Sequence, residues 1–310
     1  MDYAQKYFLH LFSLKGGDTH ATSSLLQTIP RTLPPHLVSA AEGPNEDSLL
    51  TISEIKRHIN NARRGTRARL DGIPYEVYRV FSSPLSRALI HVFNTSFLSA
   101  NPEPLKDILT SLLCLLPKQG KPAEELESYR PLSLVGTDAK LVMAIIAERL
   151  GRPLDYLIDL SQTAFLPHRD ISHNIAYHLS LSSRLKELGT PAWLLISDLT
   201  KAYDSTSRPF LFDTMHRMGF KPTGAIRWSQ ILLNGTTATI RINGFLSPHF
   251  PVPNGLAQGS ALSCPKWTIV LLPLMSYLNS LRCHVSPILV PSAANHSYPT
   301  STQQADDIKV

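Results

Sequence analysis

Cysteine is scarce in this sequence. Only Cys114, Cys264 and Cys283 occur among 310 residues, and they are far apart. An odd number of widely spaced cysteines argues against a disulfide framework and against a zinc site built on cysteine. A reducing compartment fits this usage, so we expect an intracellular protein with no disulfide-linked partner.

Long apolar runs are also missing. The longest, Leu112–Leu116 and Ile269–Leu272, are too short to cross a bilayer. Residues Met1–Lys15 lack the basic start and unbroken apolar stretch of a signal peptide. The twelve histidines are scattered without a convincing ligand pair, and no internal repeat is visible. We therefore expect no membrane partner, and the choice between nucleus and cytoplasm stays open.

The residues that are present favour a folded, basic protein. Hydrophobic residues make up 43% of the chain, enough for a sizeable core, and the net charge is +6. A basic balance suits a polyanionic partner, although a protein that is simply basic fits it too. Six basic residues follow the start of an expected helix at Ile52, where they form either a phosphate-contacting surface or a solvated face: Lys56, Arg57, Arg63, Arg64, Arg67 and Arg69.

Helical and strand patterns alternate along the chain. We interpret residues 1–48, with their prolines, as a tail or linker with one short helix. Apolar spacing and stop signals predict helices over Pro84–Leu98, Thr137–Leu150, Ser172–Leu188 and Arg208–Met218. A further helix follows Ser260, with interruptions at Pro265 and Pro273.

Two kinds of strand signal accompany these helices. The apolar runs Leu112–Leu116 and Trp193–Ile196 are typical of buried strands, and the second ends directly before Ser197-Asp198. Asn243-Gly244 separates Thr237–Ile242 from Phe245–Val252, which is a strong hairpin signal. Interleaved helices and strands with a hairpin predict a mixed α/β (α+β) architecture.

Three acidic residues suggest a metal site. Adjacent carboxylates such as Asp306 and Asp307 repel one another unless cations lie near them. Carboxylate oxygens are the ligands that Mg²⁺ prefers. Asp198, at the end of a separate strand, could converge with the pair to hold two metal ions for nucleotidyl transfer. Surface acids at strand ends are the alternative at this point.

Ordered sequence blocks decide between these interpretations. They are Leu115–Lys121, Glu127–Leu134, Thr137–Lys140, Ala147–Leu150, Gln162–Phe165, Arg169, Asn174-Ile175, Ser197–Asp204, Asn254–Ser263 and Ala305–Asp307. In this order and near this spacing, the set closely resembles the reverse transcriptase of non-LTR (LINE-like) retrotransposons, from about residue 50 to the end. The set is far more specific than any single motif.

The resemblance implies a right-hand polymerase. Residues 49–190 would be the fingers, and residues 191–310 would be the palm, with an antiparallel sheet and packed helices. The implied activity is RNA-directed DNA synthesis from dNTPs on an RNA template with a DNA primer. Two Mg²⁺ ions, with Mn²⁺ as a substitute, would be the cofactors.

The resemblance also assigns roles to individual residues. Asp198, Asp306 and Asp307 correspond to the catalytic, metal-binding aspartates of the family. The positions that correspond to nucleotide-binding residues are Arg130, Lys118, Tyr203, Gln258 and Gly259. Tyr203 stands where an aromatic ring excludes a ribose hydroxyl, and Arg130 has the planar fork that suits phosphate. Arg169 and Asn174 match a block tied to the template path.

The sequence departs from the family pattern in places. Gln304 replaces an aromatic residue before Ala305, Ala261 and Cys264 replace prolines, and His168 replaces a glycine. Only three residues follow Asp307, so we expect no room for the second strand of its hairpin and no thumb. A truncated retroelement remnant, at most a nucleic-acid binder without catalysis, is therefore the alternative to an active enzyme.

Overall fold

The structure is a computed structural model. It describes residues 2–13, 16–45, 47–65, 71–100, 105, 107–166, 168–189, 191, 196–281, 302–304 and 307–309, the last two segments by their backbone. The helices are α1 Asp2–Leu11, α2 Thr19–Gln27, α3 Pro35–Glu42, α4 Ile52–Asn61, α5 Tyr75–Val80, α6 Ser82–Leu98, α7 Thr137–Leu157, α8 Ile171–Leu188, α9 Arg208–Arg217, α10 Ala225–Leu233 and α11 Ser263–Ser280. The strands are β1 Ser111–Pro117, β2 Tyr129–Leu134, β3 Ile196–Asp198, β4 Thr237–Ile242, β5 Phe245–Leu246, β6 Phe250–Pro251, β7 Thr302–Gln304 and β8 Asp307–Lys309.

The strands form two sheets. The first has the order β2-β1-β4-β5, and β6 also pairs with β4. It is mixed, because β1 runs antiparallel to β2 and parallel to β4. The second sheet is antiparallel, with β8 between β3 and β7. The predicted mixed α/β class is confirmed, and no helix in the described ranges is long and apolar enough to cross a membrane.

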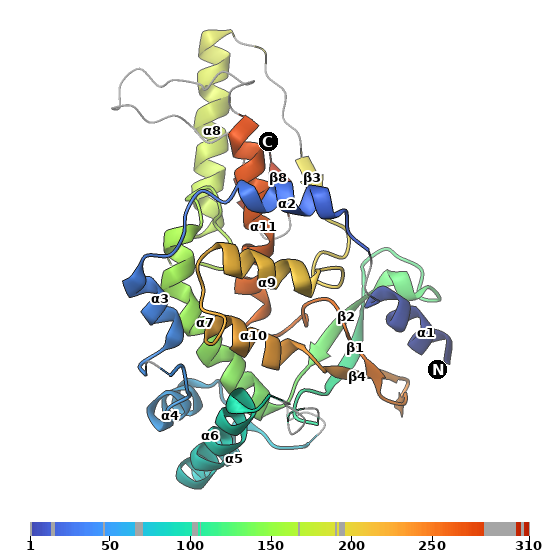
Figure 1. The fold of residues 1–310 in the computed structure, drawn as a ribbon. Coiled ribbons are helices and arrows are strands. Elements are labelled where there is room, and N and C mark those ends of the chain that lie inside the picture. The colour runs from blue at the N-terminus through green and yellow to red at the C-terminus, as the bar shows by residue number, and fades with distance from the viewer. Residues whose placement is uncertain are drawn as a thin grey trace.

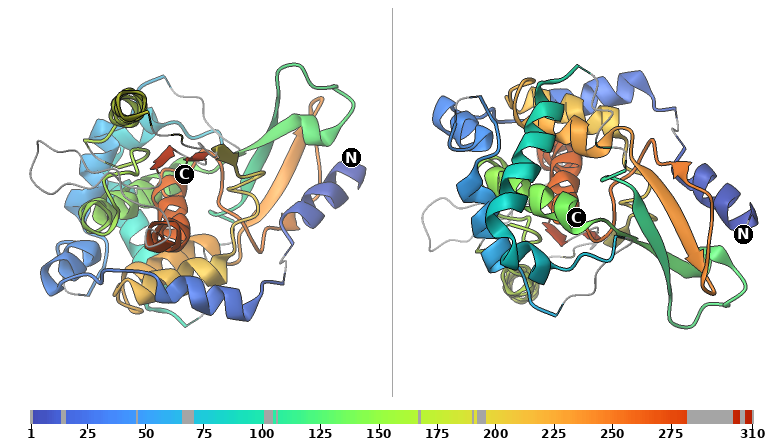
Figure 2. Two further views of the ribbon diagram at one scale, coloured as in Figure 1. Left: turned by 90° about the horizontal axis from the view of Figure 1, so that it is seen from above. Right: turned by 90° about the horizontal axis from the view of Figure 1, so that it is seen from below.

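The first sheet and the helices occupy different sides of the molecule. Figure 2 shows β1, β2 and β4 with α1 on one side and most of the helices on the other. Within the helical part, α7 is central, since it contacts α3, α4, α10 and α11. Helix α8 projects away from this body (Figure 1). Trp228 of α10 stacks on Phe97 of α6, with 4.6 Å between ring centroids, and closes the core between these helices.

Several local predictions are confirmed because they depend on neighbours in sequence. Asn243 and Gly244 have φ of 51° and 86°, the positive values that a two-residue hairpin turn requires, and β4 pairs with β5 across them. Helix α8 ends at Gly189 in the left-handed conformation. The predicted strand Leu112–Leu116 lies within β1, although the strand is buried only at its start and Leu116 is exposed.

The expectation of one short helix in residues 1–48 is wrong. Three helices form there, and Pro35 occupies the first position of α3, where its missing N–H costs nothing. Phe8 and Phe12 of the first segment pack with Leu113, Ile240 and other sheet residues in a small second core. These contacts between distant segments make the N-terminal region part of the folded body. No local sequence pattern predicts them.

The expected helix ends at prolines are also wrong. Helix α7 continues past Gly151 and Pro153 to Leu157, and α11 is continuous through Pro265 and Pro273. Pro265 lies in the first turn of its helix, where the N–H would have no helical partner. An interior proline costs roughly 3 kcal/mol, which burial of the following leucines offsets. In α7 these buried residues are Leu154 and Leu157.

Candidate active site

Two of the predicted metal-binding aspartates occupy opposed positions in the second sheet. Asp198 is the last residue of β3, Asp307 is the first residue of β8, and the two are paired in the antiparallel register. Directly opposed residues have Cα atoms roughly 4.5–5.5 Å apart. Figure 1 shows β3 and β8 side by side. The third aspartate, Asp306, lies outside the described residues.

The surroundings of Asp198 differ from the expectation in two ways. The run Trp193–Ile196 was predicted to be a buried strand, but β3 is exposed along its whole length, and residues 192–195 lie outside the described part. A strand does follow Asp306, since β8 pairs with β7 and with β3. The prediction of no room for this strand is wrong, because three residues suffice when β3 supplies a second hydrogen-bonding partner.

An open pocket of about 650 Å³ brings together three of the predicted nucleotide-binding residues. Tyr203, Gln258 and Gly259 line it, and so does Lys140. The Tyr203 ring lies 5.6 Å from the Trp267 ring, centroid to centroid, and its hydroxyl donates to Cys264 Sγ at 3.9 Å. Contacts with α11 therefore support the tyrosine on one side, and its other side borders the pocket.

Gln258 is fixed by a residue to which the sequence assigned no role. Its Nε2 atom donates to both carboxylate oxygens of Asp204, at 2.9 and 3.1 Å, and its backbone oxygen accepts from Ser133 at 2.8 Å. Burial raises the pKa of Asp204 to about 6, against the opposing effects of Gln258 and of the charges on Lys201 and Lys118. A signal for this pair existed, because Asp204 closes the same block as Asp198.

Glycines bring the two loops of the site into close contact. Gly255 has φ of 81°, and a Cβ there would lie 2.7 Å from the backbone oxygen of Asp204. The loops are also bonded directly, since Leu256 N donates to Tyr203 O at 2.8 Å. Gly259 has φ of 100°, and a Cβ there would lie 3.1 Å from Leu132 Cδ1. Larger residues would separate the loop that carries Gln258 from β2 and from Asp204.

Arg130 and Lys118 lie on neighbouring strands outside the lining of this pocket. Arg130 is exposed on β2, where it pairs in register with Leu116 of β1. Lys118 follows the end of β1, and its Nζ atom donates to the backbone oxygen of Glu127 at 2.8 Å. Lys118 also lies close enough to Asp204 to lower its pKa. Lys118 therefore lies near Asp204, whereas Arg130 faces solvent on β2.

Arg169 and Asn174 face inward. The Arg169 side chain is 7% exposed, and its guanidinium forms an ion pair with Asp155 at 2.9 Å. It also donates to the backbone oxygens of Asp159 and Gln162, at 2.6 and 2.9 Å. Asn174 is buried in α8 and donates to Thr163 Oγ1 at 3.0 Å. These bonds tie the end of α7, the following loop and the start of α8 together.

The site holds one described candidate ligand for a metal ion. No three His, Cys, Asp or Glu side chains meet as a metal-binding cluster among the residues whose side chains the structure describes. Asp198 is the one predicted ligand whose side chain is described. Its carboxylate is exposed and takes part in none of the ion pairs found among the described residues.

The comparison with protein families decides the classification. The family described as reverse transcriptase (RNA-dependent DNA polymerase) matches residues 116–286, more than half of the chain. The chain belongs to the reverse transcriptase family. The matched range includes Arg130, Tyr203 and Gln258, which carried the resemblance in the sequence, and it ends before the Asp306-Asp307 pair.

The relatives that the chain matches are proteins of transposable elements. The chain is 24% identical over 277 residues to the transposon TX1 uncharacterized 149 kDa protein of Xenopus laevis, across 89% of the chain and 20% of that protein. It is 27% identical over 159 residues to the Pol polyprotein of the retrotransposable element R2DM of Drosophila melanogaster, across 51% of the chain and 15% of that protein. A third relative, the Pol polyprotein of element R2 of Bradysia coprophila, is 25% identical over 245 residues, across 78% of the chain and 27% of that protein.

These identities confirm the resemblance to reverse transcriptases of non-LTR retrotransposons. The chain spans about a quarter or less of the length of the relatives that it matches.

Proposed function

We propose that this chain forms the fingers and palm of an RNA-directed DNA polymerase that adds dNTPs to a DNA primer on an RNA template. The fingers would comprise residues 49–190 and the palm residues 191–310. The observation that carries the proposal is the pairing of Asp198 with Asp307 in a reverse transcriptase family member. Residues opposed across antiparallel strands share one face of a sheet, so aspartates at these positions would bring their carboxylates close enough to share metal ions.

Asp198, Asp306 and Asp307 would hold two Mg²⁺ ions. The donor set fits, because carboxylate oxygens are hard ligands and the Asp198 carboxylate is exposed at a strand end. When bound, such a pair of ions activates the primer 3′-hydroxyl and neutralises charge on the leaving pyrophosphate. Because β8 is paired on both of its edges, it would hold the backbone of Asp307 opposite Asp198.

The pocket lined by Tyr203 and Gln258 would take the incoming nucleotide. Tyr203, supported by Trp267, would exclude a ribose 2′-hydroxyl by filling the space next to the sugar. Gln258, fixed by Asp204, would contact the nucleotide or the template base. Arg130 and Lys118 would add positive charge for the triphosphate, as charge-assisted bonds to phosphate favour.

Arg169 and Asn174 would act on the template indirectly. Their side chains are engaged with Asp155 and Thr163, so we infer that they shape the loop before α8 and do not reach the RNA themselves. The exposed residues of that loop, such as Phe165, are better placed to meet a strand of nucleic acid.

Primer extension by the 310-residue chain tests the proposal. The assay uses an RNA template, a labelled DNA primer, dNTPs and Mg²⁺, with EDTA as the metal-removal control. Asp198→Asn and Asp307→Asn should each lower the rate by at least about 100-fold, because a neutral amide binds Mg²⁺ poorly. Asp213→Asn changes an exposed aspartate outside the site and should leave the rate unchanged.

Two outcomes contradict the proposal. Equal extension by the wild-type chain and both aspartate variants would show that synthesis comes from elsewhere. RNA binding without any Mg²⁺-dependent synthesis would instead favour a nucleic-acid binder that lacks catalysis.

A further inference from the structure

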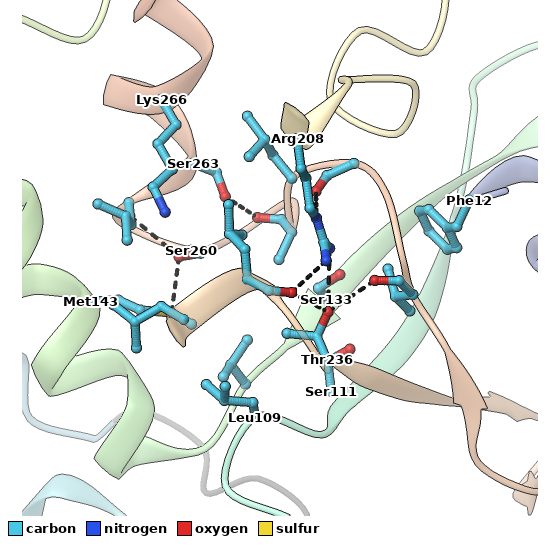
Figure 3. Close-up of a pocket in the computed structure, with 18 of the residues that line it drawn as sticks. Phe12, Leu109, Ser111, Ser133, Met143, Arg208, Thr236, Ser260, Ser263 and Lys266 are labelled. Atoms are coloured by element: carbon cyan, nitrogen blue, oxygen red, sulfur yellow. Dashed lines mark hydrogen bonds between the residues drawn. The ribbon is translucent and has the colours of Figure 1, made fainter. Parts of the chain in front are cut away.

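A buried lysine in α11 has no partner for its amine. Lys266 has no solvent exposure, and among the described residues its Nζ atom has no hydrogen-bond partner. Buried ammonium groups are normally paired, because removal from water is costly. The side chain borders a small cavity of about 40 Å³ between α11, α9 and the first sheet (Figure 3). The amine therefore has room for a ligand at this cavity.

A second cation borders the same cavity. Arg208, the first residue of α9, is 4% exposed. Its guanidinium donates to the backbone oxygens of Gly255 and Asn254, at 2.9 and 3.3 Å, and to that of Leu233. All of these acceptors are neutral. Burial lowers the pKa of Arg208 to about 10, which leaves it charged near neutral pH. Its charge is therefore solvated by dipoles and not balanced by a carboxylate.

No acidic side chain stands among the described residues that line this cavity. Hydroxyl-bearing residues do, including Ser133, Ser260 and Ser263. Burial, followed by the charge of Arg208, lowers the pKa of Lys266 well below its usual value. Helix α11 begins at Ser263, so the positive end of its dipole lies in the same region. The charge of Arg208 and the positive end of the α11 dipole therefore both favour a negative ligand.

We propose that the cavity binds a small monovalent anion, such as chloride, between Lys266 and Arg208. Its volume of about 40 Å³ exceeds the roughly 10–15 Å³ that a single water molecule needs, so it has room for a small ion. The anion would balance Arg208, accept a hydrogen bond from Lys266, and fasten the start of α11 to α9. It would thus stabilise the fold beneath the Gln258 loop without taking part in the proposed chemistry.

Thermal unfolding in matched salts tests this site. The 310-residue chain is melted in sodium chloride and in sodium gluconate at equal concentration, since gluconate is too large for the cavity. Chloride should raise Tm by about 2–5 °C relative to gluconate, as expected for a ligand that binds only the folded state. Lys266→Met, an apolar residue of similar length, should remove this difference, and Lys221→Met, at an exposed lysine, should keep it.

Bromide gives a direct second measurement. Crystals of the wild-type chain grown in bromide should show an anomalous peak within hydrogen-bond distance of Lys266 Nζ, whether or not the methionine variant folds. Equal Tm in chloride and gluconate, a chloride effect that survives Lys266→Met, or a cavity without bromide would each overturn the proposal. Equal Tm values in the two salts would mean that Lys266 is a neutral buried amine with no bound anion.

Discussion

The carboxamide of Gln258 donates to both carboxylate oxygens of Asp204, at 2.9 and 3.1 Å. This contact joins the loop after β3 to the loop before α11, and both loops border the pocket that Tyr203 and Gln258 line. Asp204 is 4% exposed, so its ionised form depends on Gln258 and on nearby lysines. The pair links the shape of the pocket to the protonation of one aspartate.

Asp204→Asn should change the pH dependence of stability. The pKa of Asp204 rises from 3.8 to about 6 on folding, so the folded chain binds more protons between these values. The stabilisation is complete below the unfolded pKa and is lost as pH rises through about 6. The asparagine variant lacks this loss and should gain roughly 2 kcal/mol over wild type between pH 4 and pH 7.5.

Urea unfolding across this pH range measures the difference. Asp213→Asn, at an exposed position on α9, is the matched control and should follow the wild-type curve. Parallel curves for wild type and Asp204→Asn would show that the carboxylate is not destabilised by burial.

Tyr203→Ala should weaken discrimination against ribonucleotides, if the pocket binds the incoming nucleotide. Removal of the ring, which rests 5.6 Å from Trp267, opens space next to the sugar. We expect the ratio of dNTP to rNTP incorporation to fall by about 10-fold or more, a loss typical of a single steric contact. Tyr203→Phe keeps the ring and removes the hydroxyl, which bonds to Cys264, so it should retain the wild-type ratio. An unchanged ratio in the alanine variant would place the sugar elsewhere.

Gly255→Ala should destabilise the chain more than Gly244→Ala does. Both glycines have positive φ, 81° and 86°, so both substitutions introduce backbone strain of about 1 kcal/mol. Only Gly255 adds a clash, because its Cβ would lie 2.7 Å from the Asp204 backbone oxygen, whereas the space around Gly244 is open. We expect a total cost of about 3 kcal/mol at Gly255, measured by chemical denaturation. Similar costs at the two positions would mean that the loops separate easily.

Arg169→Lys should lower the free energy of unfolding and leave the contacts with nucleic acid unchanged. A lysine cannot reproduce the fork that reaches Asp155, Asp159 and Gln162 together, so we expect a loss of about 2–4 kcal/mol. Arg152→Lys, at an exposed arginine of α7, should be close to neutral. If the lysine variant kept the wild-type stability but lost affinity for RNA, Arg169 would have to contact the template directly.

Local features were predictable because their causes lie within a few residues. Asn243-Gly244 determines a hairpin through backbone preference, and Gly189 ends α8 for the same reason. The ordered blocks around Arg130, Asp198 and Gln258 identified the family, since their order and spacing are properties of the chain itself. None of this information depends on which segments meet in space.

Only the tertiary structure determined which distant segments contact one another and how these contacts change their side chains. Pro153 lies inside α7 because the leucines beyond it are buried, and Arg169 turns inward because carbonyl and carboxylate oxygens surround it. The sequence named Asp198 and Asp307 as partners by resemblance, while the strand register placed them in opposition. In the sequence, nothing distinguishes Lys266 from the other basic residues. Only the packing of α11 against α9, α7 and α2 makes it a buried amine, because burial and the field of Arg208 exist only in the folded chain.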